Sequence, residues 1–281
     1  MPERARLRVF VYGAGKVGRA LDAGLRAARW PVTLRAARRG LPKKPIDADL
    51  VVLALRDRDL APAVEKLVAT RGVARGAAVV HVAGALDESV LAPLRALGAS
   101  VAQMHPMISF ASRTFFPSLA RGNVHVQGDR VAVSRAKKVA RALGMTARHF
   151  PELDTVGYHA AAALLANGAA ALAAQAERVL VASHVPPRDA PRLLGPLLRS
   201  VADNVERLGF PGSLTGPVRR GDPAAVERGA KTLAARAPDA LPLYRAAVLA
   251  QVPLARALDE VPAAALDAIE SWAKEPSFRR T

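Results

Sequence analysis

The stretch Val11-Tyr12-Gly13-Ala14-Gly15-Lys16-Val17-Gly18 decides the fold of this chain. It follows an apolar, strand-like run, residues 7–12, and leads into a segment with helical spacing, residues 16–28. Gly-x-Gly-x-x-Gly between a strand and a helix is the setting of a dinucleotide site. There, Gly13 permits the tight turn, Gly15 lets the backbone approach a pyrophosphate, and Gly18 lets the helix pack on the strand. The free N–H groups of the helix N-terminus favour phosphate. We therefore predict cofactor contacts along the whole turn: Gly13, Ala14, Gly15, Lys16, Val17 and Gly18.

The residues after the second predicted strand choose between NAD and NADP. Sites selective for NAD carry Asp or Glu about 20 residues after the glycine turn, bonded to the ribose 2′-hydroxyl. Here strand 32–35 leads into Ala36-Ala37-Arg38-Arg39-Gly40, and no carboxylate follows until Asp47. Because a guanidinium binds phosphate through a bidentate fork, Arg38 and Arg39 predict NADP. The alternative is two surface arginines in an arginine-rich chain. Ala54 and Leu55, at the end of the third strand, complete the predicted cofactor-binding set.

Composition narrows the class of protein. The chain has 281 residues, a net charge of +17 and no cysteine, which excludes disulfides and thiolate metal sites and suits a cytoplasmic protein. The N-terminus lacks the apolar segment of a signal peptide. The longest apolar stretch, residues 160–174, is shorter than the ~20 residues a bilayer needs and predicts a buried helix, so we expect no membrane partner. Basic residues are scattered without a run of five, so we expect no specific nucleic-acid partner.

The order of predicted elements indicates two domains. Strands at 7–12, 32–35, 50–55, 77–82 and 100–104 alternate with helices at 16–28, 60–70 and 88–97, followed by strand 124–127, helix 131–143 and strand 146–150. This alternation predicts a Rossmann-type, doubly wound, mainly parallel sheet. After Pro151 the pattern is all-helical, with one long helix over 154–183 and Gly-Pro punctuation at Gly195-Pro196 and Gly216-Pro217. We predict a nucleotide-binding domain over residues 1–152 and a helical domain over 153–281.

A histidine follows the fifth predicted strand. His105-Pro106 comes directly after Met104, at the carboxyl end of the strand, where ligands bind in open α/β sheets. A histidine there can exchange a proton with a carbonyl, imine or hydroxyl group during hydride transfer. Pro106 would fix the turn. The alternative is a structural histidine bonded to a loop carbonyl.

Several segments together resemble one family. His105-Pro106-Met107-Ile108-Ser109-Phe110, Val80-His81-Val82-Ala83-Gly84, Tyr158-His159 and Leu214-Thr215-Gly216-Pro217 with Arg220-Gly221-Asp222 resemble the Rossmann-like proteins with a C-terminal DUF2520 domain. The resemblance covers nearly the whole chain. The wider group includes 6-phosphogluconate dehydrogenase, pyrroline-5-carboxylate reductase and prephenate dehydrogenase. It implies a nucleotide domain, a helical domain that mediates a homodimer, and NADP oxidoreductase chemistry on an unassigned substrate.

The chain departs from its relatives at two positions. Ala83 stands where the family usually has serine, and Ala163 stands where hydroxyacid dehydrogenases carry a catalytic lysine, four residues before an asparagine. That asparagine is present as Asn167, and His159 lies about 80° from it around a helix. We predict His105, His159 and Asn167 as the catalytic set.

Other polar residues leave alternatives open. Tyr158 is either a proton donor or a buried helix residue. Thr215 and Arg220 are candidates for substrate contacts across a dimer, and Asp222 is better explained as a helix cap. His81 is expected to make a structural bond. We predict no metal, because His125, His149 and His184 have no partners at metal-ligand spacing.

Two functions fit these residues. The first is an NADP-dependent oxidoreductase that acts on a small carbonyl, imine or hydroxy compound in the cleft between the domains. The second is a non-catalytic NADP-binding protein with a role in assembly or sensing. The substrate and the direction of reaction are not encoded in any of these motifs.

Overall fold

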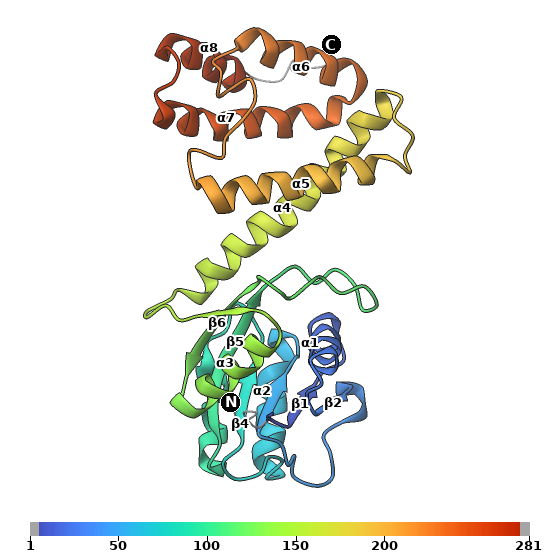
Figure 1. The fold of residues 1–281 in the computed structure, drawn as a ribbon, viewed down its shortest axis with the longest axis vertical. Coiled ribbons are helices and arrows are strands. Elements are labelled where there is room, and N and C mark those ends of the chain that lie inside the picture. The colour runs from blue at the N-terminus through green and yellow to red at the C-terminus, as the bar shows by residue number, and fades with distance from the viewer. Residues whose placement is uncertain (1–5, 276–281) are drawn as a thin grey trace. The chain divides into compact units, whose positions relative to one another are not determined.

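The computed structural model describes residues 6–275, and the chain divides into two compact units with the boundary between Ala166 and Asn167. The first unit contains one seven-stranded sheet in the order β2-β1-β3-β4-β5-β6-β7 (Figure 1). Its strands are β1 (Val9–Tyr12), β2 (Val32–Arg35), β3 (Leu50–Leu53), β4 (Ala78–His81), β5 (Ser100–Met107), β6 (Asn123–Gly128) and β7 (Thr146–Arg148). Every neighbouring pair is parallel except β5 and β6. The predicted mainly parallel sheet is confirmed.

Helices cover both faces of this sheet. On one face α1 (Lys16–Ala27) and α3 (Arg130–Ala142) share a core with alternate strand residues such as Val11 and Val80. On the other face α2 (Asp57–Ala69) and the 3₁₀ helix η2 (Glu88–Leu97) pack on Val51 and Val79. All residues of β3 and β4 are buried, as expected for central parallel strands covered on both sides. The strand order reverses between β1 and β3, which makes their carboxyl ends the topological switch point where ligands bind.

One predicted boundary is wrong. The sequence predicts that the fifth strand ends at Met104 and turns at His105-Pro106, whereas β5 continues to Met107 and pairs antiparallel with β6. The pairing with β4 stops at Gln103, so one edge of β5 is free beyond that residue. A proline costs no ladder hydrogen bond where its missing N–H would face a free edge. His105 is therefore held by a strand, opposite His125.

The second unit is helical. It contains most of α4 (Thr155–Ala182), then α5 (Ala190–Leu208), α6 (Pro223–Arg236), the 3₁₀ turn η3 (Pro238–Ala240), α7 (Leu241–Leu258) and α8 (Ala263–Lys274) (Figure 1). Its core lies among the last three helices, around Val226, Val252 and Ile269. The predicted cap is confirmed, because Asp222 accepts a hydrogen bond from the N–H of Ala225 at 2.9 Å.

Helix α5 corrects a second prediction. Gly195-Pro196 does not interrupt the chain, and α5 runs through it without a break. Proline inside a helix removes one hydrogen bond, here to the carbonyl of Arg192. Arg192 is exposed, and a helix tolerates the loss of this one hydrogen bond at a surface where water is available.

Helix α4 has an unusual surface. It is long and apolar enough, by length and composition alone, to cross a membrane. None of its most apolar window is buried within the chain, so the predicted buried helix over residues 160–174 is wrong. A helix that forms the core of a soluble assembly passes the same test, so this observation alone is weak evidence for a membrane. Leu172 and Val181 are among its exposed apolar residues.

Candidate functional site

The turn between β1 and α1 assigns a separate physical role to each of its glycines. Gly13 has φ of +118°, and a Cβ there would lie 2.2 Å from the carbonyl oxygen of Ala54. A Cβ at Gly18 would lie 1.9 Å from the carbonyl oxygen of Gly13, so both positions exclude any side chain. At Gly15 nothing lies within 4 Å of the same point, and no side chain caps the helix that starts there. The turn therefore leaves room and free N–H groups at Gly15, where a pyrophosphate would approach.

A pocket of about 540 Å³ opens beside this turn, entirely within the first unit. Gly15, Lys16 and Val17 line one part of it, with Ala54 and Leu55 from the end of β3. The remaining lining residues are Arg56, Asp57, Val82, Ala83, Gly84, His105, Pro106, Ile108, Phe110, Arg113 and His159. The pocket thus joins five of the predicted cofactor-binding residues to two of the three predicted catalytic residues.

The turn after β2 is held in shape by two side chains. Arg35 donates from Nε to the carbonyl oxygen of Gly40 at 2.6 Å and from Nη2 to that of Arg39 at 2.9 Å. The hydroxyl of Tyr12 donates to the carbonyl oxygen of Ala37 at 3.3 Å. The 3₁₀ turn η1 (Ala37–Arg39) is therefore clamped through its backbone, while the side chains of Arg38 and Arg39 remain exposed. Neither arginine lines the pocket.

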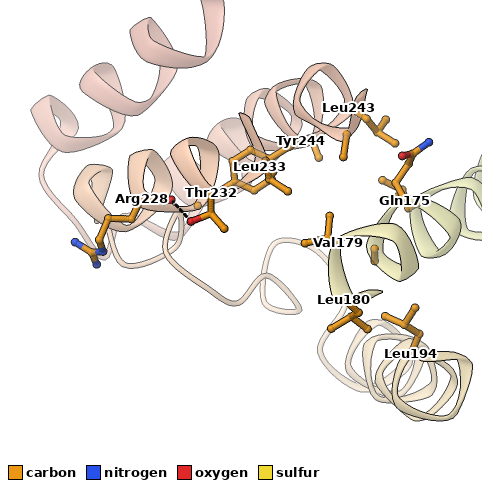
Figure 2. Close-up of a pocket in the computed structure, with 14 residues that line it drawn as sticks. Gln175, Val179, Leu180, Leu194, Arg228, Thr232, Leu233, Leu243 and Tyr244 are labelled. Atoms are coloured by element: carbon orange, nitrogen blue, oxygen red, sulfur yellow. Dashed lines mark hydrogen bonds between the residues drawn. The ribbon is translucent and has the colours of Figure 1, made fainter. Parts of the chain in front are cut away.

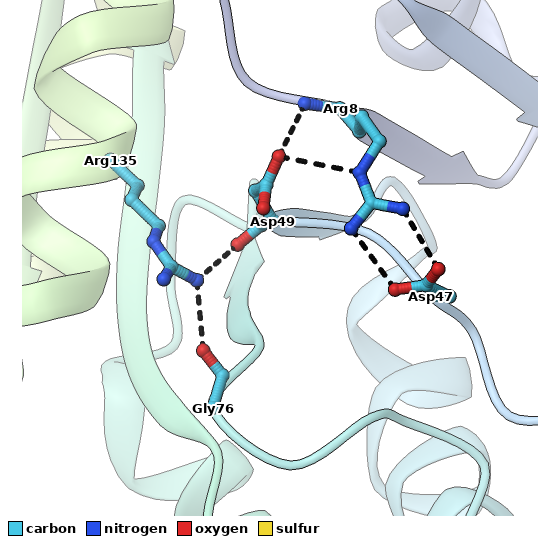
Figure 3. A network of polar contacts seen from close by, with 5 residues as sticks. All are labelled: Arg8, Asp47, Asp49, Gly76 and Arg135. Atoms are coloured by element: carbon cyan, nitrogen blue, oxygen red, sulfur yellow. Dashed lines mark hydrogen bonds and ion pairs between the residues drawn. The ribbon is translucent and has the colours of Figure 1, made fainter. Parts of the chain in front are cut away.

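The first carboxylate after this turn lies at the wrong edge of the sheet for a ribose. Asp47 precedes β3, at the amino end of the strands, and its two oxygens accept from Arg8 at 2.8 and 3.0 Å (Figure 3). Asp49 accepts from the backbone N–H of Arg8 at 2.7 Å. The hydrogen bonds and charge of Arg8 lower the pKa of Asp47. Both carboxylates thus serve the amino edge of the sheet, and the turn at Arg38 and Arg39 is left without an acidic residue.

His105 is the most buried polar residue that lines the pocket, with 9% of its surface exposed. Its Nδ1 lies 3.3 Å from the carbonyl oxygen of Val82. Because a carbonyl only accepts, Nδ1 carries the proton and Nε2 is left as the acceptor of a neutral imidazole. Burial lowers the pKa of His105. The geometry is therefore compatible with both predicted roles of His105. Nδ1 makes the structural bond to a carbonyl, and Nε2 remains free to exchange a proton.

Gly84 lets the two pocket histidines approach each other. The rings of His105 and His159 meet edge to face with centroids 5.8 Å apart. A Cβ at Gly84 would lie 2.3 Å from Nδ1 of His159 and 2.7 Å from Cε1 of His105. His159 lies on the first turns of α4 and is exposed. The absence of a side chain at residue 84 is therefore a requirement of this pair.

A second group of rings lies behind His105. Tyr158 meets His105 edge to face at 5.8 Å, and burial raises the pKa of its hydroxyl. His125 lies 6.0 Å from Tyr158 and stacks on His149 at 6.3 Å. Both ring nitrogens of His125 are buried without a hydrogen-bond partner among the described residues, and burial lowers its pKa. Tyr158 is half-buried and does not line the pocket, so its role as a proton donor stays a prediction.

The remaining predicted residues lie elsewhere. Asn167 is exposed and does not line the pocket, so its catalytic role stays a prediction. His81 makes the expected structural bond, from Nε2 to the carbonyl oxygen of Asp87 at 2.9 Å. Between residues 6 and 275, no three His, Asp or Glu side chains gather closely enough to hold a metal ion.

Sequence reasoning missed four charged or apolar contributors to the pocket. Arg56 and Asp57 begin α2, and Phe110 and Arg113 lie in the loop after β5. Loops at the carboxyl ends of parallel strands carry much of the chemistry of α/β proteins. That position was the signal available in the sequence. The segment 105–110 that carries the family resemblance includes Phe110, but Arg56, Asp57 and Arg113 lie in no such motif.

The fold and this pocket define a Rossmann-type protein with an attached helical unit. Residues 36–106 match the Rossmann-like domain and residues 123–251 match DUF2520, a domain of unknown function. The chain therefore belongs to the family of Rossmann-like proteins that carry a DUF2520 domain, which confirms the resemblance seen in the sequence.

Solved structures share the fold at low sequence identity. A candidate NADP oxidoreductase from Bacteroides fragilis superposes with a TM-score of 0.66 at 18% identity, covering 91% of this chain and 99% of that one. A pyrroline-5-carboxylate reductase from Coxiella burnetii reaches 0.55 at 15% identity, covering 96% and 98%. A reductive aminase from Aspergillus terreus, in complex with NADPH and ethyl levulinate, reaches 0.55 at 15% identity, covering 95% and 100%. The sequences of curated proteins contain no match to this chain.

Proposed function

We propose that this protein is an NADP(H)-dependent oxidoreductase that transfers hydride to or from a small carbonyl, imine or hydroxy compound. One observation carries the proposal: the dinucleotide turn at Gly15 and Lys16 lines the same pocket as His105 and His159. A hydride acceptor and a proton-exchanging group must meet at one substrate, and the pocket brings their candidate sites together. The reductase and the aminase named above share the fold, which supports the same reaction class.

The residues of the β1–α1 turn fit a bound dinucleotide. The open space at Gly15 and the uncapped start of α1 suit the pyrophosphate. The exposed guanidinium groups of Arg38 and Arg39 suit the 2′-phosphate of NADP, since no carboxylate competes for the ribose at this edge. When bound, the nicotinamide supplies or accepts the hydride. The protein would supply the binding site, the orientation of the substrate and the proton transfer.

His105 would move the proton. With Nδ1–H donated to Val82, Nε2 accepts the hydroxyl proton of a substrate that is being oxidised. In the reducing direction the same atom must first be protonated, and its lowered pKa makes that form scarcer at neutral pH. Water or exposed His159 then exchanges the proton with solvent. Val82 and Gly84 hold the ring in place and keep its neighbour close.

The competing function is NADP binding without catalysis. Ala83 and Ala163 favour it, because both lack a polar group that relatives use. His105→Ala separates the two. We expect the affinity for NADPH, measured by quenching of protein fluorescence, to change less than ~3-fold. Turnover of an oxo or imino compound should fall ~100-fold or more. Unchanged turnover would remove His105 from the mechanism, and absence of NADPH binding to the wild-type protein would refute the proposed function itself.

We also propose that the helical unit forms a homodimer. A cavity of about 600 Å³ in the second unit is lined almost wholly by carbon, with residues from α4, α5, α6 and α7 around it (Figure 2). Val179 and Leu180 face it from α4, and Leu233 and Tyr244 from α6 and α7. Helix α5 adds five exposed apolar residues: Leu193, Leu197, Leu198, Val201 and Leu208. Exposed apolar surface of this extent marks an interaction site in a soluble protein. We propose a second copy of the same chain as the partner, because most soluble oligomers are homo-oligomers.

Charge on α5 tests this dimer. The wild-type protein should elute with the mass of a dimer in size-exclusion chromatography with light scattering. Leu197→Glu places a carboxylate on the apolar face and should give a monomer, whereas Arg199→Glu, about 200° around the helix, should remain dimeric. A wild-type monomer that binds to lipid vesicles would instead support a membrane as the partner of α4 and refute the dimer.

A further inference from the structure

We infer that the substrate carries a carboxylate and that Arg113 binds it. This inference rests on the proposed function and names the class of its substrate: small oxo, imino or hydroxy acids. The loop between β5 and β6 contributes Ile108, Phe110 and Arg113 to the pocket that holds His105.

The loop is built so that Arg113 stays at the pocket. Ile108 and Phe110 are partly buried against the core, which anchors the start of the loop. Ser112 Oγ then accepts from the backbone N–H groups of Thr114 and Phe115, both at 3.1 Å. This side-chain turn encloses residue 113 and fixes its backbone. Arg113 therefore reaches the pocket from an anchored segment.

The guanidinium of Arg113 is available for a ligand. No hydrogen bond or ion pair involves it within the described part of the chain, in contrast to Arg35, which is spent on two carbonyl groups. Asp57 is the one acidic residue that lines the pocket, and it begins α2, on the side of the switch point. A negatively charged ligand could therefore accept hydrogen bonds from the Arg113 guanidinium, which has five N–H donors.

The other two cations of the pocket lie on the cofactor side. Lys16 starts α1 and Arg56 precedes α2, so both flank the carboxyl ends of β1 and β3, where the phosphates are expected. Arg113 follows β5, the strand that carries His105. The positive charge on the substrate side is thus a single guanidinium. A single unit charge matches a monoanionic carboxylate, which it binds through two parallel hydrogen bonds, better than a dianionic phosphate ester.

The remaining lining residues limit the rest of the substrate. Ile108 and Phe110 offer apolar contact, and the pocket of about 540 Å³ must also hold the nicotinamide. The substrate is therefore a short acid with an apolar body. In the reducing direction its carbonyl carbon takes the hydride from NADPH and its oxygen takes the proton, which leaves a hydroxy acid and NADP⁺.

The test compares charged and neutral ligands of the same shape. Calorimetry on the wild-type protein loaded with NADP⁺ would measure the binding of short 2-oxo acids, from pyruvate to 2-oxohexanoate, and of their amides, with dihydroxyacetone phosphate as the phosphate probe. We expect at least one acid to bind ~10-fold or more tightly than its amide and than the phosphate ester. Equal binding of acid and amide, tighter binding of the phosphate ester, or no binding of any acid would overturn the inference.

Variants assign the effect to Arg113. Arg113→Gln should weaken the acid ~10- to 100-fold and leave the amide and NADPH affinities unchanged, while Arg113→Lys should keep part of the preference. Arg141→Gln, on α3 outside this pocket, removes the same charge from the same unit and should have no effect. Equal losses in Arg113→Gln and Arg141→Gln would show general attraction to a basic protein and overturn the assignment. Failure of the proposed function has a different signature, loss of NADPH binding in the wild-type protein.

Discussion

Gly84→Ala tests the histidine pair through a single methyl group. The added carbon would lie 2.3 Å from Nδ1 of His159 and 2.7 Å from Cε1 of His105. Both separations are well inside the ~3.5 Å at which non-bonded atoms attract. Gly84 does not have positive φ, so the backbone accepts alanine and the effect is purely steric. Both rings therefore have to give way, and the closer contact is with His159.

The structure indicates which ring moves further. His105 is buried in β5 and bonded to Val82, whereas His159 is exposed on α4 and free to rotate outward. Overpacking of this kind costs ~1–3 kcal/mol. In a chain of this size, a loss of 1 kcal/mol lowers the melting temperature by about 2–4 °C. We therefore expect Gly84→Ala to melt several degrees below the wild-type protein and still bind NADPH.

A double-mutant cycle isolates the contact. His159→Ala removes the atom nearest to the new methyl group, so the double variant should recover ~1 kcal/mol or more of the stability lost in Gly84→Ala. Urea denaturation of the four proteins gives the coupling free energy directly. Additive effects, within about 0.5 kcal/mol, would refute the reasoning, because they would show that residue 84 and His159 do not touch.

Two further predictions concern the cofactor and pH. The double variant Arg38→Ala with Arg39→Ala should weaken NADPH ~10-fold or more and leave NADH nearly unchanged in fluorescence titrations, and equal losses would contradict a 2′-phosphate site. Burial lowers the pKa of His81, His105 and His125, so the unfolded chain takes up protons first as the solution is acidified. The free energy of unfolding should therefore fall as the pH drops below the ordinary histidine value of about 6.5. His125→Phe should reduce this dependence in urea titrations at several pH values, and an unchanged slope would show that His125 is not buried neutral.

Local patterns predicted the sheet because each strand and its turn are encoded within a few residues. The roles of Gly13 and Gly18 follow from their own backbone contacts, and α4 ends where Pro186 and Pro187 follow. The extension of β5 depends on pairing with β6, which lies later in the chain, so no window around His105 contains it. Pro106 alone indicates a turn, but the strand continues through it because its missing N–H faces a free strand edge.

The sequence likewise identified some residues of the candidate site and missed others. His105 and His159 carry chemistry in any context, so their residue types drew attention to them. Gly84 matters only because two rings from distant segments meet above it, which sequence spacing does not reveal. Arg113 is one of many arginines in the chain, and only its unengaged guanidinium at the pocket distinguishes it.

The clamp around η1 separates the shape of the cofactor turn from its charge. Arg35 and Tyr12 hold the turn through the carbonyl groups of Ala37, Arg39 and Gly40, and no side chain within the turn takes part. Residues 38 and 39 are therefore exchangeable surface on a rigid loop. Under the proposed 2′-phosphate site, coenzyme preference could therefore be changed by substitutions at these two positions without altering the backbone that carries them.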